Sequence, residues 1–143
     1  MNIEALNENV RERSPSRQMN YALWIAQGLL ALIFLSAGGM KLLVSDDVLT
    51  SMVPPNSVAL PGWFLRFIGV AEILGAIGVI LPRLLRIRPG LTPLAAAGLG
   101  VIMIGATVVT LLGGQIGPAF IPFTVGLLAV FVAYGRSDGR SRR

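Results

Sequence analysis

The chain has 143 residues, of which 54% are hydrophobic and only 13% are charged, with a net charge of +5. Soluble domains carry about a quarter charged residues, so the composition excludes a fold whose whole surface faces water and favours the bilayer as the main solvent. The chain contains no cysteine and no histidine. This excludes thiol chemistry, histidine-ligated haem and cysteine-based iron–sulfur or zinc sites, and we expect no metal site.

The two ends of the chain differ in character from its middle. Residues 1–17 alternate charges of both signs with polar residues and show no apolar periodicity, which predicts a flexible cytoplasmic leader. Residues 18–135 hold the apolar runs and form the predicted membrane domain. Residues 136–143 are rich in arginine, and we predict a solvated basic tail that is attracted to anionic headgroups.

Four apolar runs are each about the 20 residues that a spanning helix needs. The fourth contains Pro118 and Pro122; a helix that began only at Pro122 would be too short to cross, so we start it near Pro118. The connections after the second and third runs are short, which makes sequential helices antiparallel neighbours. The sequence therefore predicts an all-α membrane protein, an antiparallel bundle of four transmembrane helices over residues 19–43, 63–81, 91–112 and 117–134.

The basic residues predict the orientation of this bundle. Ten of the twelve lie in the leader, in the connection after the second helix or in the tail, while residues 44–62 and 113–115 contain none. By the positive-inside bias, both termini and the middle connection are cytoplasmic, in a multi-pass protein of the cytoplasmic (inner) membrane. The arginines flank helices without interleaved aromatic residues, so we expect the lipid bilayer and no nucleic acid as their partner.

Small residues mark the expected helix contacts, because in lipid they let backbones approach closely. The second helix offers three of them and the third helix two. The predicted packing residues are Gly69, Gly75, Ala76, Ala96 and Gly100.

Three charged residues lie within or at the ends of the predicted spans: Lys41, Arg66 and Glu72. Arg66 and Glu72 are six residues apart, which turns a helix by about 600° and leaves them about 120° apart. Glu72 shares its face with small residues and so points into the bundle. Side chains lean toward the N-terminus of their helix, so Lys41 and Glu72 converge, and we predict that they pair. Arg66 either joins this polar network or reaches outward to Asp46 or Asp47.

Two interpretations of this network remain open. In the first, a buried ion pair fixes how the first two helices pack. In the second, the network lines a cavity that opens to the outer leaflet, where it binds a polar headgroup or relays protons, as ionisable residues within membranes often do. Among the other polar residues, Thr107 and Thr110 are predicted to bond to their own helix, and Gln27 to cross-link helices or contact a ligand.

Three segments together resemble the DoxX-like family of small four-helix membrane proteins. They are FLSAGGMKLL (34–43), RFIGVAEILGAIGVILP (66–82) and LTPLAAAGLGVIMIGA (91–106). The resemblance covers residues from about 19 to 134. The positions that it marks are Lys41, Arg66, Gly69, Glu72, Gly75 and Pro82.

The resemblance also implies a function. The founding members of the family are membrane subunits associated with thiosulfate:quinone oxidoreduction and with terminal quinol oxidase, and others are linked to responses to oxidative stress. It implies an accessory membrane subunit of a quinone-linked redox or oxidative-stress complex, with no independent enzymatic activity and a redox partner subunit. A quinone would use Glu72 with Lys41 or Arg66 as its polar contacts.

The alternative is a structural scaffold or assembly factor, in which Lys41, Arg66 and Glu72 only fix the helix packing. A small transporter or proton leak is a weaker third hypothesis, since four short helices leave little room for a pore. The sequence leaves the oligomeric state open.

Overall fold

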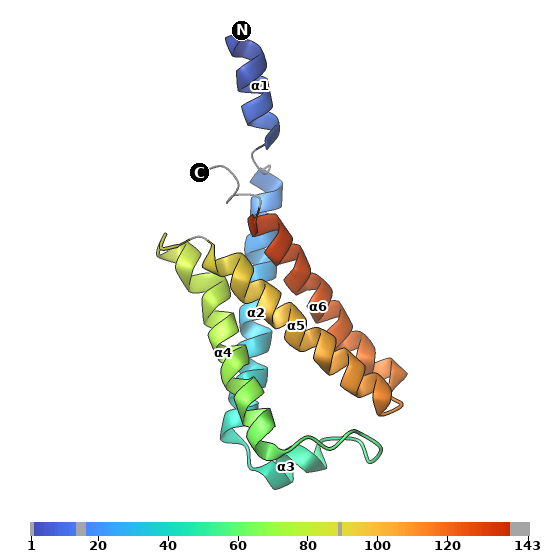
Figure 1. Ribbon diagram of the computed structural model, residues 1–143. Coiled ribbons are helices and arrows are strands. Elements are labelled where there is room, and N and C mark those ends of the chain that lie inside the picture. Colours follow the sequence, from blue (N-terminus) through green and yellow to red (C-terminus); the bar gives the residue numbers. More distant parts are fainter. Residues whose placement is uncertain (1, 14–16, 89, 138–143) are drawn as a thin grey trace.

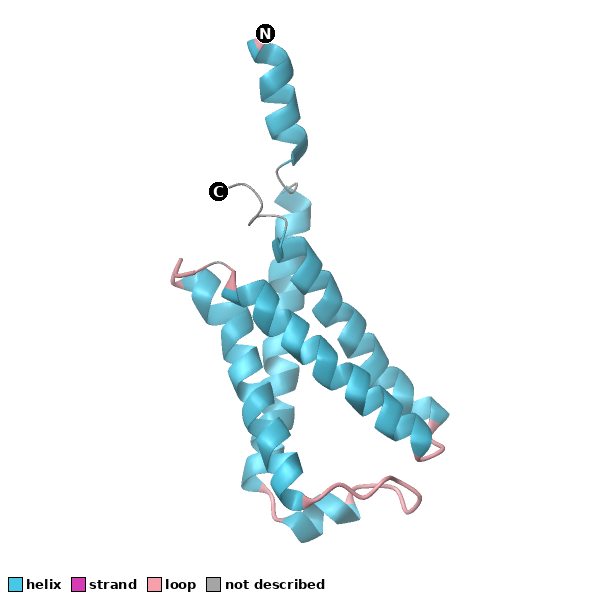
Figure 2. Cartoon of the chain, in the orientation of Figure 1, coloured by secondary structure: helices cyan, strands magenta, loops and turns pink. Residues whose placement is uncertain are grey.

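The computed structural model describes residues 2–13, 17–88 and 90–137. These residues form helices and their connections and contain no strand (Figures 1 and 2). The helices in chain order are α1 (Ile3–Arg13), α2 (Arg17–Leu43), α3 (Asp46–Ser51), α4 (Gly62–Leu84), α5 (Leu91–Leu112) and α6 (Ile116–Ser137).

Four of these helices, α2, α4, α5 and α6, are long and apolar enough to cross a bilayer. Each presents large apolar side chains outward: Leu32, Phe67, Val101 and Ile121 are all more than 60% exposed. Apolar surface on this scale is unfavourable in water and is expected where lipid covers it. The chain is therefore a multi-pass membrane protein, and the predicted all-helical fold with four spans is confirmed.

The four spans are arranged as two pairs. Figure 1 shows α2 beside α4 and α5 beside α6, with the pairs close together where α2 begins and α6 ends, and apart toward α3. The buried core lies where the pairs meet. It consists of Ala26, Leu30, Phe34, Ala76, Val79, Ala96, Leu99, Ala129 and Val132.

The helices begin and end where proline, glycine or residues in the left-handed conformation interrupt the α conformation. Pro61 precedes α4 with an extended backbone, which suits the residue before a helix. Arg86 and Arg88 have φ values of 56° and 36° in the connection to α5. Gly114, with φ at 75°, turns the chain between α5 and α6, a conformation that glycine adopts without steric cost.

Small residues hold the α4–α5 contact together. Ala76 and Ala96 are fully buried in the core, and a Cβ on Gly75 would lie 2.5 Å from Leu99 Cδ2. Gly100 differs, because a Cβ there would meet α6 only at an ordinary distance, 3.8 Å from Val130. Of the predicted packing residues, Gly69 and Gly75 thus lie at close contacts and Gly100 at a looser one, while Ala76 and Ala96 are buried.

The structure also corrects several predicted boundaries. Helices α4 and α6 extend past their predicted limits, to residues 84 and 137, because Arg83 and Arg136 in their last turns interact favourably with the C-terminal end of the helix dipole. Helix α2 begins at Arg17, two residues before its predicted start. The leader contains α1, whose sequence is rich in good helix formers such as Glu, Ala, Leu and Arg. Arg136, assigned to a solvated tail, belongs instead to α6 and is buried. The rest of that tail, residues 138–143, lies outside the described residues.

Candidate functional site

Lys41 on α2 and Glu72 on α4 form an ion pair between the helices. Lys41 Nζ donates to both carboxylate oxygens of Glu72, at 2.9 Å and 3.2 Å. The Glu72 side chain is 3% exposed and that of Lys41 is 25% exposed. The carboxylate is thus enclosed by protein, while the lysine sits at the edge of the contact.

Two glycines, each one helical turn before a charged residue, position this pair. A Cβ on Gly38 would lie 2.7 Å from the carbonyl oxygen of Gly69 and 3.3 Å from Glu72 Cβ. A Cβ on Gly69 would lie 3.0 Å from Lys41 Cβ. Each glycine therefore makes room for the charged residue of the other helix. The spacing is the same on both helices, G-x-x-K on α2 and G-x-x-E on α4.

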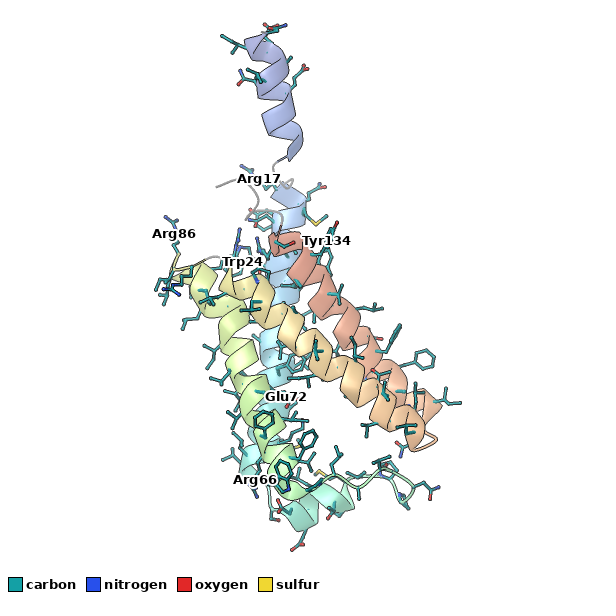
Figure 3. The ribbon with its side chains drawn as sticks, viewed as in Figure 1. Arg17, Trp24, Arg66, Glu72, Arg86 and Tyr134 are labelled. Atoms are coloured by element: carbon teal, nitrogen blue, oxygen red, sulfur yellow. The ribbon has the colours of Figure 1, made fainter. Side chains whose placement is uncertain are left out.

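Arg66 lies apart from this pair. Its guanidinium bonds to Asp46 Oδ1 at the start of α3 and to the carbonyl oxygen of Leu42, each at 3.0 Å. The Arg66 and Asp46 side chains are 43% and 57% exposed. The three residues do not form one network, because Arg66 points from a different face of α4 than Glu72 and lies about 9 Å away along the axis. Figure 3 shows Arg66 nearer the α3 end than Glu72.

A second polar cluster lies at the opposite end of the bundle, around Arg136. Arg136 Nε donates to Gln27 Oε1 at 2.7 Å, and Nη1 donates to Asn20 Oδ1 at 2.9 Å. Gln27 Nε2 donates in turn to the carbonyl oxygen of Val79 at 2.7 Å. The Arg136 guanidinium also lies 5.5 Å from the centre of the Trp24 ring, a cation–π contact. The cluster therefore links α2, α4 and α6.

This cluster contains a buried positive charge that none of the described ion pairs neutralises. Arg136 is 4% exposed, and its Nη2 is a buried donor without a partner. Thr92, at the start of α5, likewise has a buried hydroxyl without a hydrogen-bond partner. Arg83, half-buried at the end of α4, is close enough to Arg136 for their like charges to repel each other.

Sequence reasoning identified only one member of this cluster. Gln27 stood out as an amide within an apolar run, and its predicted role in cross-linking helices agrees with its bonds to Arg136 and Val79. Arg136 was missed because it follows the apolar run and resembles the arginines of the tail. No local sequence signal marks it, because its burial depends on Gln27 and Asn20, which approach from α2. Thr107 and Thr110 bond to carbonyl oxygens of their own helix, as predicted.

A cavity of about 490 Å³ lies at the α3 end of the bundle. Its walls come from α3, the connection to α4, Leu65 of α4 and the junction of α5 with α6. Most of the lining is apolar, and its polar side chains are Thr50, Ser57, Thr110 and Gln115. Lys41, Arg66 and Glu72 do not line it, although Arg66 follows Leu65 directly. This cavity is therefore not the one that Lys41, Arg66 and Glu72 were predicted to line.

The DoxX-like family matches residues 25–133 of the chain, about three quarters of its length. The chain belongs to the DoxX-like family. The match includes Lys41, Arg66, Glu72 and the small residues that pack α4 against its neighbours. No match was found among curated proteins or among solved structures. Within its described residues, this DoxX-like protein has no group of three or more acidic, histidine or cysteine side chains arranged to hold a metal ion.

Proposed function

We propose that this DoxX-like protein is a non-catalytic or accessory membrane subunit of a quinone-linked redox or oxidative-stress complex. The cavity at the α3 end is the observation that carries the proposal. Binding sites for small molecules are concave, mostly apolar and about 300–1,000 Å³ in volume, with a few polar groups that orient the ligand. The cavity of about 490 Å³ has this character, which suits a quinone ring with a long apolar tail.

Gln115 and Ser57 are the polar groups best placed to contact a quinone carbonyl. Gln115 Nε2 donates to Ser57 Oγ within the cavity wall. The hydroxyl of Thr110 is already bonded to the carbonyl oxygen of Ala106. The amide of Gln115 and the hydroxyl of Ser57 can exchange their mutual bond for bonds to the ligand, since an amide and a hydroxyl each combine donors with acceptors.

In this proposal, Glu72 handles protons for the bound quinone. Leu65, which lines the cavity, and Glu72 are seven residues apart, so they share a face of α4 and are separated by about 10.5 Å along the axis. A carboxylate held by one lysine can accept a proton when the lysine is displaced. Reduction of a quinone to its quinol takes up two electrons and two protons. The electrons would come from a partner subunit, and this chain would supply the quinone site, with Glu72 passing the two protons from water to the quinone one at a time.

The test is quinone reduction by membranes that contain the chain and its redox partner. We expect Glu72→Gln to lower the rate at least about 10-fold, as loss of a group in proton transfer does, while the protein still accumulates. Arg66→Gln is the matched control, because it removes a charge from the same helix at an exposed pair, and it should keep the rate. Full activity in Glu72→Gln would refute the role of Glu72.

The alternative function, a scaffold or assembly factor, is favoured by the glycine-lined geometry of the Lys41–Glu72 pair. A pair built into a close contact of two helices fits a role in fixing their packing. In that case, the exchange of Lys41 and Glu72 should restore the accumulation that either single exchange removes. Failure of the double exchange to accumulate would count against the scaffold.

A further inference from the structure

The buried charge of Arg136 has no use in the proposed quinone site, because it lies at the other end of the bundle. Arg136 is 4% exposed, yet its described partners are neutral: Gln27, Asn20 and the Trp24 ring. Removing a cation from water is unfavourable unless charge or hydrogen bonds compensate. The guanidinium has five N–H donors, and both of those on Nη2 lack a partner.

Arg83 makes the charge imbalance larger. It lies on α4 one helical turn after Val79, whose carbonyl oxygen accepts a hydrogen bond from Gln27 of the cluster, so its like charge is near that of Arg136. Two cations held together in a partly buried site repel each other, so an anion between them would lower the energy of both. A guanidinium also matches a phosphate in geometry, since its N–H groups bind two oxygens at once.

The position of the cluster indicates which phosphate is available. Arg136 is the second-last residue of α6, a membrane-spanning helix. Trp24 is part of the cluster, and Tyr21 and Tyr134 are 62% and 73% exposed; such aromatic residues gather at the level of the lipid headgroups. Figure 3 shows Arg17, Trp24, Arg86 and Tyr134 toward the same end of the bundle. Basic pockets between helices at this depth bind anionic headgroups.

We propose that Arg83 and Arg136 together bind the phosphate group of an anionic phospholipid at this end of the bundle. Arg83 is half-buried and offers the accessible donors, and Arg136 supplies the buried donors of Nη2. The Nη2 atom is closed off in this conformation, so a side-chain movement at the surface of the cluster has to admit the phosphate. The lipid would then fasten α4 to α6, whose ends carry the two arginines.

The test is native mass spectrometry of the full chain in mild detergent with equal amounts of phosphatidylglycerol and phosphatidylcholine of identical acyl chains. We expect the protein to retain phosphatidylglycerol preferentially. Arg83→Gln and Arg136→Gln should each lower that retention about 10-fold, the loss expected from one hydrogen bond to a charged group. Arg66→Gln is the control, since Arg66 is an arginine near the opposite end, and it should leave retention unchanged.

Several results would overturn the proposal. If both Arg83→Gln and Arg136→Gln retained as much phosphatidylglycerol as the wild-type protein, the proposal would be wrong. Arg83→Gln is the safer variant, because Arg83 is only half-buried and its loss is less damaging to the fold. If inorganic phosphate raised the unfolding temperature as much as phosphatidylglycerol does, the ligand of the site would be free phosphate and not a lipid headgroup. Asp138 lies two positions after Arg136 and outside the described residues. If the wild-type protein showed no preference for phosphatidylglycerol and Asp138→Asn did, the carboxylate of Asp138 would be the anion that the arginines bind.

Discussion

Gly38 and Gly69 face each other where α2 meets α4, so closely that a Cβ on Gly38 would lie 2.7 Å from the carbonyl oxygen of Gly69. One turn further along each helix, Lys41 and Glu72 form their ion pair. The close approach of the backbones and the pairing of the charges are thus one feature, since side chains of ordinary size at positions 38 and 69 would hold the helices apart.

The first prediction concerns this contact. Gly38→Ala should destabilise the protein by about 1–3 kcal/mol, because the added methyl group meets the backbone oxygen of Gly69, which cannot move aside as the end of a flexible side chain can. Gly39→Ala is a matched control on the same helix, where an added Cβ meets nothing within 4 Å. The measurement is thermal unfolding in detergent. Equal midpoints for the two variants would contradict the assignment of Gly38 to the helix contact.

The second prediction is that the two partners of the ion pair are not equivalent. Lys41→Met leaves the carboxylate of Glu72, which is 3% exposed, without a counter-charge and should destabilise the protein by about 3 kcal/mol. Glu72→Gln should destabilise it less, because Lys41 is 25% exposed and can extend toward the membrane surface. Arg66→Gln should have an effect of at most about 1 kcal/mol, since its pair with Asp46 is exposed.

Chemical unfolding of the three purified variants measures this order. A larger loss of stability in Glu72→Gln than in Lys41→Met would contradict the burial that the structure assigns to the two side chains. A loss in Arg66→Gln as large as in Lys41→Met would show that Arg66 belongs to the inner network after all.

The third prediction tests the Arg136 cluster. Gln27→Leu should destabilise the protein by about 1–3 kcal/mol, because it leaves Arg136 Nε, a buried donor, without its acceptor. Ser36→Ala on the same helix is the control. The Ser36 hydroxyl is exposed and bonds only to the carbonyl oxygen of Leu32, so its loss should be nearly neutral. Unfolding temperatures measured in one detergent distinguish the two outcomes, and equal temperatures would argue against the cluster.

The fourth prediction concerns topology, which rests on the distribution of basic residues. The chain has no cysteine, so single cysteines can report on each side of the membrane. Asn56→Cys, in the exposed connection between α3 and α4, should react with a membrane-impermeant maleimide in intact cells. Arg86→Cys, between α4 and α5, should react only after permeabilisation. The reverse pattern would invert the predicted orientation.

The features that sequence reasoning predicted depend on local periodicity and length. Four apolar runs of spanning length give four helices whatever their partners are, and helical rise and side-chain lean were enough to direct Lys41 toward Glu72. The structure shows that contact at 2.9 Å. The predicted α5 bounds, 91–112, are also those of the structure.

The remaining features depend on tertiary contacts that no local pattern contains. Arg136 carries a charge and therefore counts as a polar residue in hydropathy, so only the approach of Gln27 and Asn20 from α2 explains its burial. Arg66 had two open assignments because the start of α3 was unknown; Asp46 at that start decides between them. The cavity at the α3 end was missed because four separate segments form it.

The measurement that tests the central claim most directly is native mass spectrometry of the purified chain for bound quinone. The wild-type protein and Ser36→Ala should retain a quinone added during purification, whereas Gln115→Leu, which removes an amide from the cavity wall, should retain at least about 10-fold less. No retained quinone in the wild-type protein, or equal retention in Gln115→Leu, would contradict the quinone-linked function.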